Sequence, residues 1–143
     1  MGKAMTQRSL RPNPALKHLE VLVGEWEMGS SLYPGQYGRV TFEWLEGGAF
    51  LVERMADNAI WIIGRDESAQ TYCMLYFDSR GVSRIYEMSL EGVVWKVWRN
   101  SPRFSQRFTG AFDDGNTITG HWEKSDDGSN WEHDFDVTYT KVR

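Results

Sequence analysis

His133 is the residue whose type and position best suit a chemical role. It lies in a segment in which Trp131, Phe135 and Tyr139 alternate with acidic residues and threonines. This period-two pattern predicts a β-strand with one buried face, and alternation places His133 on that face with the aromatic residues. A neutral imidazole in an apolar interior could ligate haem iron from one side. It could also be a buried histidine that hydrogen-bonds a neighbouring tyrosine or carboxylate, and both interpretations stay open.

Charged residues within strongly apolar segments are the next candidates for chemistry. Glu53 and Arg54 are neighbours in one such segment, so one of the two side chains must point inward. Arg107 lies between Phe104 and Phe108 in another. An inward Glu–Arg pair with a tyrosine and His133 would form a polar floor that orients a ligand carboxylate or phenol, and the same groups could carry out acid–base chemistry. The alternative is that each of these charges lies on the outer face, because an unpaired buried charge is costly.

The sequence lacks the common catalytic and cofactor motifs. It has no Gly-x-Ser-x-Gly elbow, no P-loop and no dinucleotide fingerprint. Its three histidines have no zinc-binding spacing, and the single cysteine, Cys73, excludes an internal disulfide and a cysteine-based zinc site. The Asp pairs at 113–114 and 126–127 lack the ligand pattern of a calcium loop and are explained by turns. We therefore assign no catalytic and no metal-binding residue, and we expect binding rather than enzymatic activity.

Length and composition limit the class of protein. A chain of 143 residues is expected to form one domain with a sound core. The net charge is −4 and the basic residues are scattered, which argues against a nucleic-acid partner. Without a signal peptide or a membrane-spanning apolar run, a cytoplasmic protein with no membrane partner is expected. Aromatic residues make up 14% of the chain, a density that fills a core or lines a pocket for a flat or apolar ligand.

The first part of the chain predicts a leader and a short helix. Residues 1–12 are polar and basic and are predicted to be disordered. Asn13 offers an N-cap and Pro14 suits the first helical position, which predicts a helix over 14–23 with a leucine face. Gly24 can adopt the left-handed conformation that ends a helix.

The rest of the chain predicts antiparallel strands. Short alternating segments are separated by turns rich in Gly and Asp, with room for about ten strands. Consecutive hairpins favour an up-and-down meander, and closing it removes the sheet edges. We predict that residues 13–143 form a single all-β domain, a closed up-and-down antiparallel barrel with one short N-terminal helix. The segments 59–64, 72–77 and 93–98 are apolar on both faces, so the helix or a second subunit could cover them, which leaves a homodimer open.

Gly24-Glu25-Trp26, which follows the helix and opens the first strand, resembles the signature of the calycin barrels. These include lipocalins, fatty-acid-binding proteins and the haem-binding nitrobindins. The longer segments 18–28, 38–55 and 113–142 are similar to a family of bacterial lipocalin-like proteins of unknown function. These segments are spread along the chain from residue 18 to residue 142, so the resemblance implies a lipocalin-like barrel.

The resemblance also implies roles for single residues. In such barrels the tryptophan closes one end and a basic residue near the C-terminus stacks on it; Trp26 matches, with Lys141 or Arg143 as its partner. This role is structural. Nitrobindins have a proximal histidine late in the chain, and His133 is similar in placement. The chain departs from their pattern after Trp26, where 27–30 stands in place of a glycine-repeated turn.

From the sequence we infer that a small hydrophobic or aromatic molecule binds inside the barrel. The wall candidates are Trp44, Tyr76, Tyr86, Trp95 and Phe135, and the polar contacts are Glu53, Arg107 and His133. A β-bulge would shift these assignments by one residue. Three alternatives remain: a haem protein with His133 as axial ligand, a small enzyme with an inward Glu/Arg/Tyr set, and a barrel filled by its own side chains whose outer aromatic strands dimerise. The identity of the ligand or cofactor stays open.

Overall fold

The computed structural model of the protein describes residues 12–143. The predicted disordered leader, apart from Pro12, lies outside the described residues. Ten antiparallel strands follow one short helix, η1 (Pro14–Leu22), with a single turn, η2 (Glu46–Gly48), between the second and third strands. The strands are β1 (Gly24–Ser30), β2 (Tyr37–Leu45), β3 (Phe50–Met55), β4 (Ile60–Asp66), β5 (Thr71–Phe77), β6 (Ser83–Glu91), β7 (Val94–Arg99), β8 (Ser105–Asp113), β9 (Thr117–Ser125) and β10 (Glu132–Lys141).

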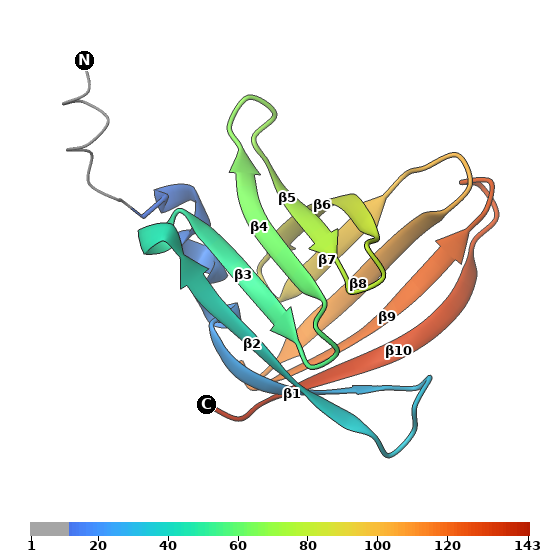
Figure 1. The fold of residues 1–143 in the computed structure, drawn as a ribbon, viewed down its shortest axis with the longest axis horizontal. Helices are drawn as coiled ribbons and strands as arrows, with labels where there is room; N and C mark the ends of the chain where they lie inside the picture. Colours follow the sequence, from blue (N-terminus) through green and yellow to red (C-terminus); the bar gives the residue numbers. More distant parts are fainter. Residues whose placement is uncertain (1–11) are drawn as a thin grey trace.

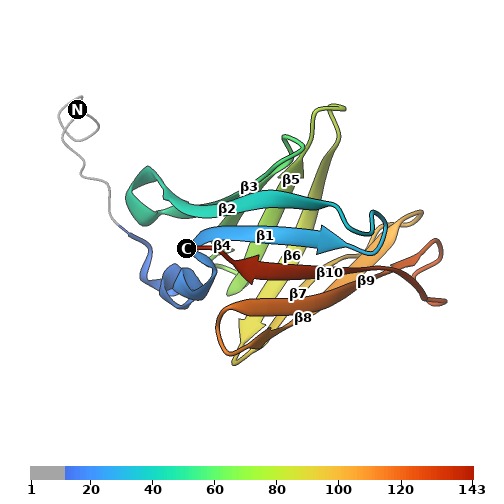
Figure 2. The ribbon, with the colours of Figure 1, turned by 90° about the horizontal axis from the view of Figure 1, so that it is seen from below.

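The strands close into a barrel (Figure 1). Each strand pairs with its neighbours in sequence, and β1 pairs with β10 to complete the ring. Figure 2 shows β1 and β10 side by side, with the short blue helix at the end of the barrel where the C-terminus lies. Because the ring is complete, no strand of the sheet is left with an unpaired edge. The prediction of an all-β, closed up-and-down barrel of about ten strands is confirmed.

The helix η1 covers one end of the barrel, which we call the closed end. The Asn13 side chain accepts a hydrogen bond from the Ala15 amide at 3.0 Å and so caps its first turn. Leu16, Leu19 and Leu22 are completely buried. These leucines recur every third residue, which aligns them along one side of a 3₁₀-helix with its three residues per turn. The predicted helix is confirmed, in the 3₁₀ form.

Gly24 does not end the helix as predicted but opens β1. Val23 caps η1 in an extended conformation, and Gly24 has a φ of +136°. A Cβ atom at Gly24 would stand 2.5 Å from the carbonyl oxygen of Arg143. Glycine is therefore required here by both the backbone angle and the close approach of the C-terminal segment.

Trp26 packs at the closed end. Its side chain is completely buried, and its indole Nε1 donates a hydrogen bond to the carbonyl oxygen of Leu22 at 2.8 Å. The Lys141 ammonium lies 5.4 Å from the centre of the Trp26 ring. Arg143 instead forms an ion pair with Glu25 at 2.9 Å. Of the two basic residues that the resemblance suggested, Lys141 is the one that lies over the tryptophan.

Alternation along the strands separates an inner from an outer face. In β6, Tyr86 and Met88 are buried in the interior, whereas Ile85 and Glu87 are exposed. No helix within residues 12–143 combines the length and the apolar character needed to cross a bilayer.

Candidate ligand-binding cavity

The interior of the barrel contains a cavity of about 730 Å³. Because the strands alternate in direction, the β1–β2, β3–β4 and β5–β6 connections lie at the end of the barrel opposite η1. Residues of these three connections line the cavity, among them Tyr33, Asp57 and Arg80. The cavity therefore extends from this end, which we call the open end, into the centre of the barrel.

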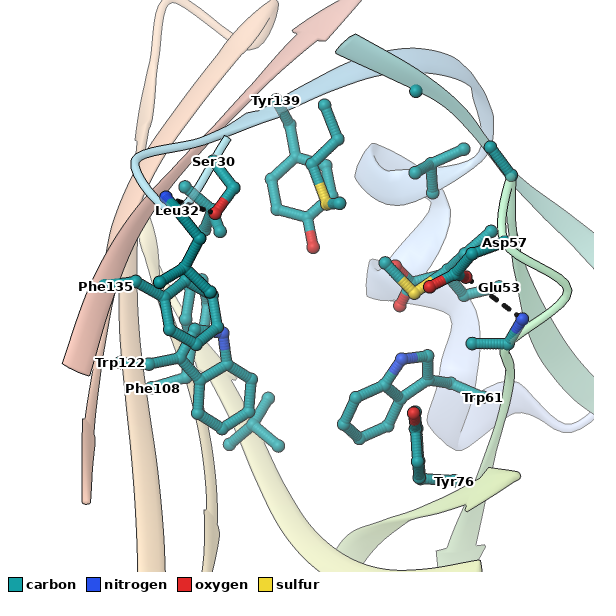
Figure 3. Close-up of a pocket in the computed structure, with 18 of the residues that line it drawn as sticks. Ser30, Leu32, Glu53, Asp57, Trp61, Tyr76, Phe108, Trp122, Phe135 and Tyr139 are labelled. Atoms are coloured by element: carbon teal, nitrogen blue, oxygen red, sulfur yellow. Dashed lines mark hydrogen bonds between the residues drawn. The ribbon is translucent and has the colours of Figure 1, made fainter. Parts of the chain in front are cut away.

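Aromatic rings form most of the inner wall. The Trp61 ring centre lies 4.8 Å from that of Tyr76, 4.9 Å from that of Tyr86 and 6.4 Å from that of Trp122. Trp122 also stacks near Phe135, at 6.3 Å. Figure 3 shows Trp61 and Tyr76 on one side of the cavity, with Trp122, Phe135 and Phe108 facing them. These rings present a nearly continuous aromatic surface to the cavity.

Four inward residues form one row across four neighbouring strands. Glu53 of β3 is the register partner of Trp61 in β4, Trp61 pairs with Tyr76 in β5, and Tyr76 pairs with Arg84 in β6. The Arg84 guanidinium lies 5.9 Å from the centre of the Tyr76 ring. All four side chains line the cavity. The row thus has a carboxyl group at one end, a guanidinium at the other and two aromatic rings between them.

Glu53 is the one acidic residue among the fully buried side chains of the described chain. It is 2% exposed, and its Oε2 atom has no hydrogen-bond partner. Burial raises the pKa of the Glu53 carboxyl to about 8, against a smaller opposing effect of the Tyr139 hydroxyl. The pKa of Tyr139 is raised well above its usual value, first by burial and then by the Glu53 charge. Glu53 is therefore largely protonated at neutral pH in the free protein, and Figure 3 shows its carboxyl and the Tyr139 hydroxyl directed into the cavity.

The opposite wall has polar groups of its own. The Tyr86 hydroxyl donates a hydrogen bond to the side-chain carbonyl of Gln106, which is buried beside it. Trp95 is 2% exposed, and its indole Nε1 has no hydrogen-bond partner within the described residues. The Trp95 ring lies 5.9 Å from the Tyr139 ring. An unsatisfied donor and an unsatisfied acceptor therefore both occur in the wall of this cavity.

A hydrogen-bonded group orders the open end. The Tyr76 hydroxyl donates to Asp78 Oδ2 at 2.6 Å, and the Arg80 guanidinium donates to the same oxygen at 2.6 Å. The Arg80 and Tyr76 hydrogen bonds hold the pKa of Asp78 well below its usual range. Burial and the neighbouring Asp78 raise the pKa of Tyr76 to about 12, so its hydroxyl stays neutral.

Five of the eight residues proposed as ligand contacts line the cavity. They are Glu53, Tyr76, Tyr86, Trp95 and Phe135. Trp44 is half-buried and packs against the core, but it does not line the cavity. The structure thus brings together the acidic residue and most of the aromatic residues that alternation had placed inside. Contact of any of these residues with a ligand stays a prediction.

His133 does not face the interior, and the prediction that it does is wrong. Its side chain is 56% exposed, and its Nε2 atom lies 2.8 Å from Asp136 Oδ1. The cause is a β-bulge in the β10–β9 pairing between His133 and Phe135. The extra residue, Asp134, breaks the alternation, so that Phe135 is the first inward residue of β10.

The cavity does not fit a haem held by a histidine. An axial ligand must point at the iron from inside the barrel. Within residues 12–143 none of the three histidines lines the cavity. His18 contacts the Tyr72 hydroxyl beside η1, and His121 is exposed. The side chains that line the cavity are instead mainly apolar and aromatic.

Arg107 also lies on the outer face. Its Nε atom donates to Glu123 Oε1 at 2.8 Å, and its guanidinium lies 4.0 Å from the centre of the Trp131 ring. Its neighbours Gln106 and Phe108 point inward and line the cavity, so alternation requires Arg107 to point outward. The inward pair of a glutamate with Arg107 does not form.

Several wall residues were not singled out from the sequence. Alternation already indicated the inner face for Trp122, which is opposite His121, and for Tyr139, which follows Phe135 at even spacing. Trp61 had no such signal, because its segment is apolar on both faces. Its position at the centre of the aromatic wall depends on the pairing of β4 with β3 and β5.

Comparison with known proteins gives a likeness of fold. No family model matches the chain, and no curated protein sequence matches it. Among solved structures, the chain is similar to the crystal structure of Rv2717c from M. tuberculosis, with a TM-score of 0.51 and 14% sequence identity. The likeness covers 92% of this chain and 99% of that chain. At this level of identity it shows that the two proteins share the barrel fold over nearly their whole length.

Proposed function

We propose that the protein binds a small hydrophobic or aromatic molecule inside its barrel. The observation that carries this proposal is the cavity of about 730 Å³, lined mainly by aromatic and apolar side chains and reaching the open end. Binding pockets for small molecules typically measure about 300–1,000 Å³ and combine apolar walls with a few polar groups. Both features are present.

The size of the barrel supports the same conclusion. A barrel of about eight strands has an interior that side chains can just fill. This barrel has ten strands, so its interior is wider. Trp122 and Phe135 remain only half-buried although they point inward. Covering such apolar surface with a ligand contributes roughly 25 cal/mol per Å² removed from water.

The test is to measure binding of a probe before and after a larger side chain is introduced into the cavity wall. We expect the wild-type protein to bind naphthylmethanol, a neutral aromatic probe, measured by isothermal titration calorimetry. Val97 is buried and lines the cavity, so Val97→Phe places a ring in the space that the probe would occupy. We expect this variant to bind at least about tenfold more weakly, a loss of roughly 1.4 kcal/mol.

Val93→Phe is the matched control. Val93 precedes the same strand but is 58% exposed and does not line the cavity, so its substitution adds the same group on the surface. We expect wild-type affinity. The proposal fails if neither naphthylmethanol nor a long-chain aliphatic probe binds the wild-type protein, or if both variants bind as well as the wild type does.

A further inference from the structure

The cavity contains a buried carboxyl group, that of Glu53, with one oxygen that has no hydrogen-bond partner within the described residues. Among residues 12–143, only Glu53 Oε2 and Trp95 Nε1 are buried side-chain polar atoms without a hydrogen bond, and both residues line the cavity. Buried polar groups are hydrogen-bonded in the great majority of cases, and an unpaired buried carboxyl is among the costliest exceptions. A ligand group that binds there would remove this cost.

The chemistry of Glu53 points to a cationic partner. Elsewhere in the cavity wall the hydrogen-bond acceptor is a neutral amide, because the Gln106 side chain accepts the hydrogen bond from Tyr86. At Glu53 the chain has a group that can carry a full negative charge. No lysine or arginine of the described chain forms an ion pair with Glu53, and in the register row Arg84 is separated from it by Trp61 and Tyr76.

The surroundings of Glu53 suit a positive charge as well. Its register partner Trp61 lies within 4.8 Å of Tyr76 and 4.9 Å of Tyr86, measured between ring centres. The faces of tryptophan and tyrosine rings attract cations, most strongly where water is excluded. A carboxyl group beside several such rings is a combination that binds an ammonium group through both charge and ring faces.

We propose that the ligand carries a protonated amine on an apolar or aromatic body, and that the Glu53 carboxylate binds this ammonium group. The inference rests on the proposed function and specifies the class of its ligand. The body of the ligand occupies the part of the cavity lined by Trp61, Trp122 and Phe135. When the ammonium group binds, Glu53 releases to solvent the proton that it holds in the free protein. The resulting carboxylate is then neutralised by the positive charge of the ammonium group.

The test compares three probes that share one aromatic body. Naphthylmethylamine is cationic at neutral pH, naphthylmethanol is neutral and naphthoic acid is anionic. We expect the wild-type protein to bind the amine most tightly. In Glu53→Gln, which keeps the size of the side chain but loses its charge, affinity for the amine falls by roughly 30-fold or more, as for loss of one member of a buried charge pair. Affinity for the alcohol changes by a smaller factor, so the ratio of amine affinity to alcohol affinity falls by about tenfold or more.

Glu43→Gln is the matched control. Glu43 lies in the neighbouring strand β2 but its side chain is 57% exposed and pairs with Arg54 on the outer face. This variant makes the same Glu-to-Gln change in the same part of the barrel but on its outer face, and we expect the wild-type order of the three probes.

A second measurement needs no variant. Calorimetry of the wild-type protein in two buffers with different ionisation enthalpies reports protons released on binding. We expect proton release with naphthylmethylamine at neutral pH and none with naphthylmethanol.

The outcomes separate this inference from the proposed function. If the alcohol binds but the amine binds no tighter, or if Glu53→Gln keeps the preference for the amine, the assignment of an amine ligand is overturned and the binding function stands. If amine binding releases no proton, the role of Glu53 is overturned as well. If none of the three probes binds but the long-chain aliphatic probe does, only the inference fails; if the aliphatic probe does not bind either, the proposed function fails as well.

Discussion

Glu53 differs from every other acidic residue discussed above in its contact with water. The ion pairs Arg54–Glu43 and Arg107–Glu123 lie on the outer face of the barrel, where such pairs contribute little to stability. Glu53 is buried, and its pKa is raised to about 8. The folded state therefore binds a proton at Glu53 more tightly than the unfolded state does, whose glutamates titrate near 4.5.

This difference predicts how stability depends on pH. Between about pH 5 and about pH 8 the folded state holds a proton that the unfolded state has lost, so the free energy of unfolding falls as pH rises, by up to about 1.4 kcal/mol per pH unit. Glu53→Gln cannot ionise and lacks this contribution. We expect the variant to gain stability relative to wild type as pH rises, measured by urea denaturation across this range.

Other shifted groups do not mimic this effect. The carboxyls of Asp78 and Asp127 have lowered pKa values, so their stabilising effects are lost only as pH falls below the ordinary range for aspartate. Tyr139, which faces Glu53, has a pKa raised well above its usual value and stays neutral throughout. Parallel stability curves for the wild type and Glu53→Gln would contradict the prediction.

At the scale of helices and strands, the sequence predicted the kind of element more reliably than its pairing. Leu16, Leu19 and Leu22 predict η1 because their spacing is a local property of the chain. The orientation of His133 depends on a bulge in the pairing of β10 with β9, and alternation within one strand does not reveal the bulge. The central place of Trp61 likewise depends on its partners in β3 and β5. The barrel and the place of five of the eight proposed contact residues in the cavity wall could be predicted from the sequence. The direction of a side chain beside a β-bulge, as at His133, could not.

The close approach of the C-terminal segment to Gly24 in β1 leads to a prediction at this scale. Gly24 and Gly35 both have positive φ values, +136° and +78°, but a Cβ atom at Gly24 would meet the Arg143 carbonyl oxygen at 2.5 Å, while none of the described atoms lies within 4 Å at Gly35. We expect Gly35→Ala to lower the free energy of unfolding by about 1–2 kcal/mol from backbone strain alone. Gly24→Ala adds displacement of the C-terminal segment and costs more. Urea denaturation of the two variants measures the difference, and equal losses would contradict the close approach.

At the scale of the whole molecule, the cavity exists only when the ring is complete. Every strand is needed to close the barrel, and residues from β1 to β10 line the cavity. A ligand of the proposed class therefore has its site on the folded state only, with no comparable site on the unfolded chain. We expect naphthylmethylamine at about 100 times its dissociation constant to stabilise the protein by about 2.7 kcal/mol.

Thermal and urea unfolding at several probe concentrations measure this stabilisation. Val97→Phe, which fills the cavity, is expected to show a smaller shift at the same concentration, and Val93→Phe the full shift. An unfolding transition that stays in place at saturating probe would contradict binding inside the barrel.

The pairing of β1 with β10 also bears on the synthesis of the protein. The first and last strands of the ring are made at opposite ends of a translated segment, and β10 supplies Phe135, Val137 and Tyr139 to the cavity wall. During translation β1 has no partner on this side until β10 has been added. A nascent chain that stops before β10 thus has two open strand edges, no enclosed cavity and no Tyr139 beside Glu53. We therefore expect premature termination late in the message to abolish the proposed binding as completely as termination early in it.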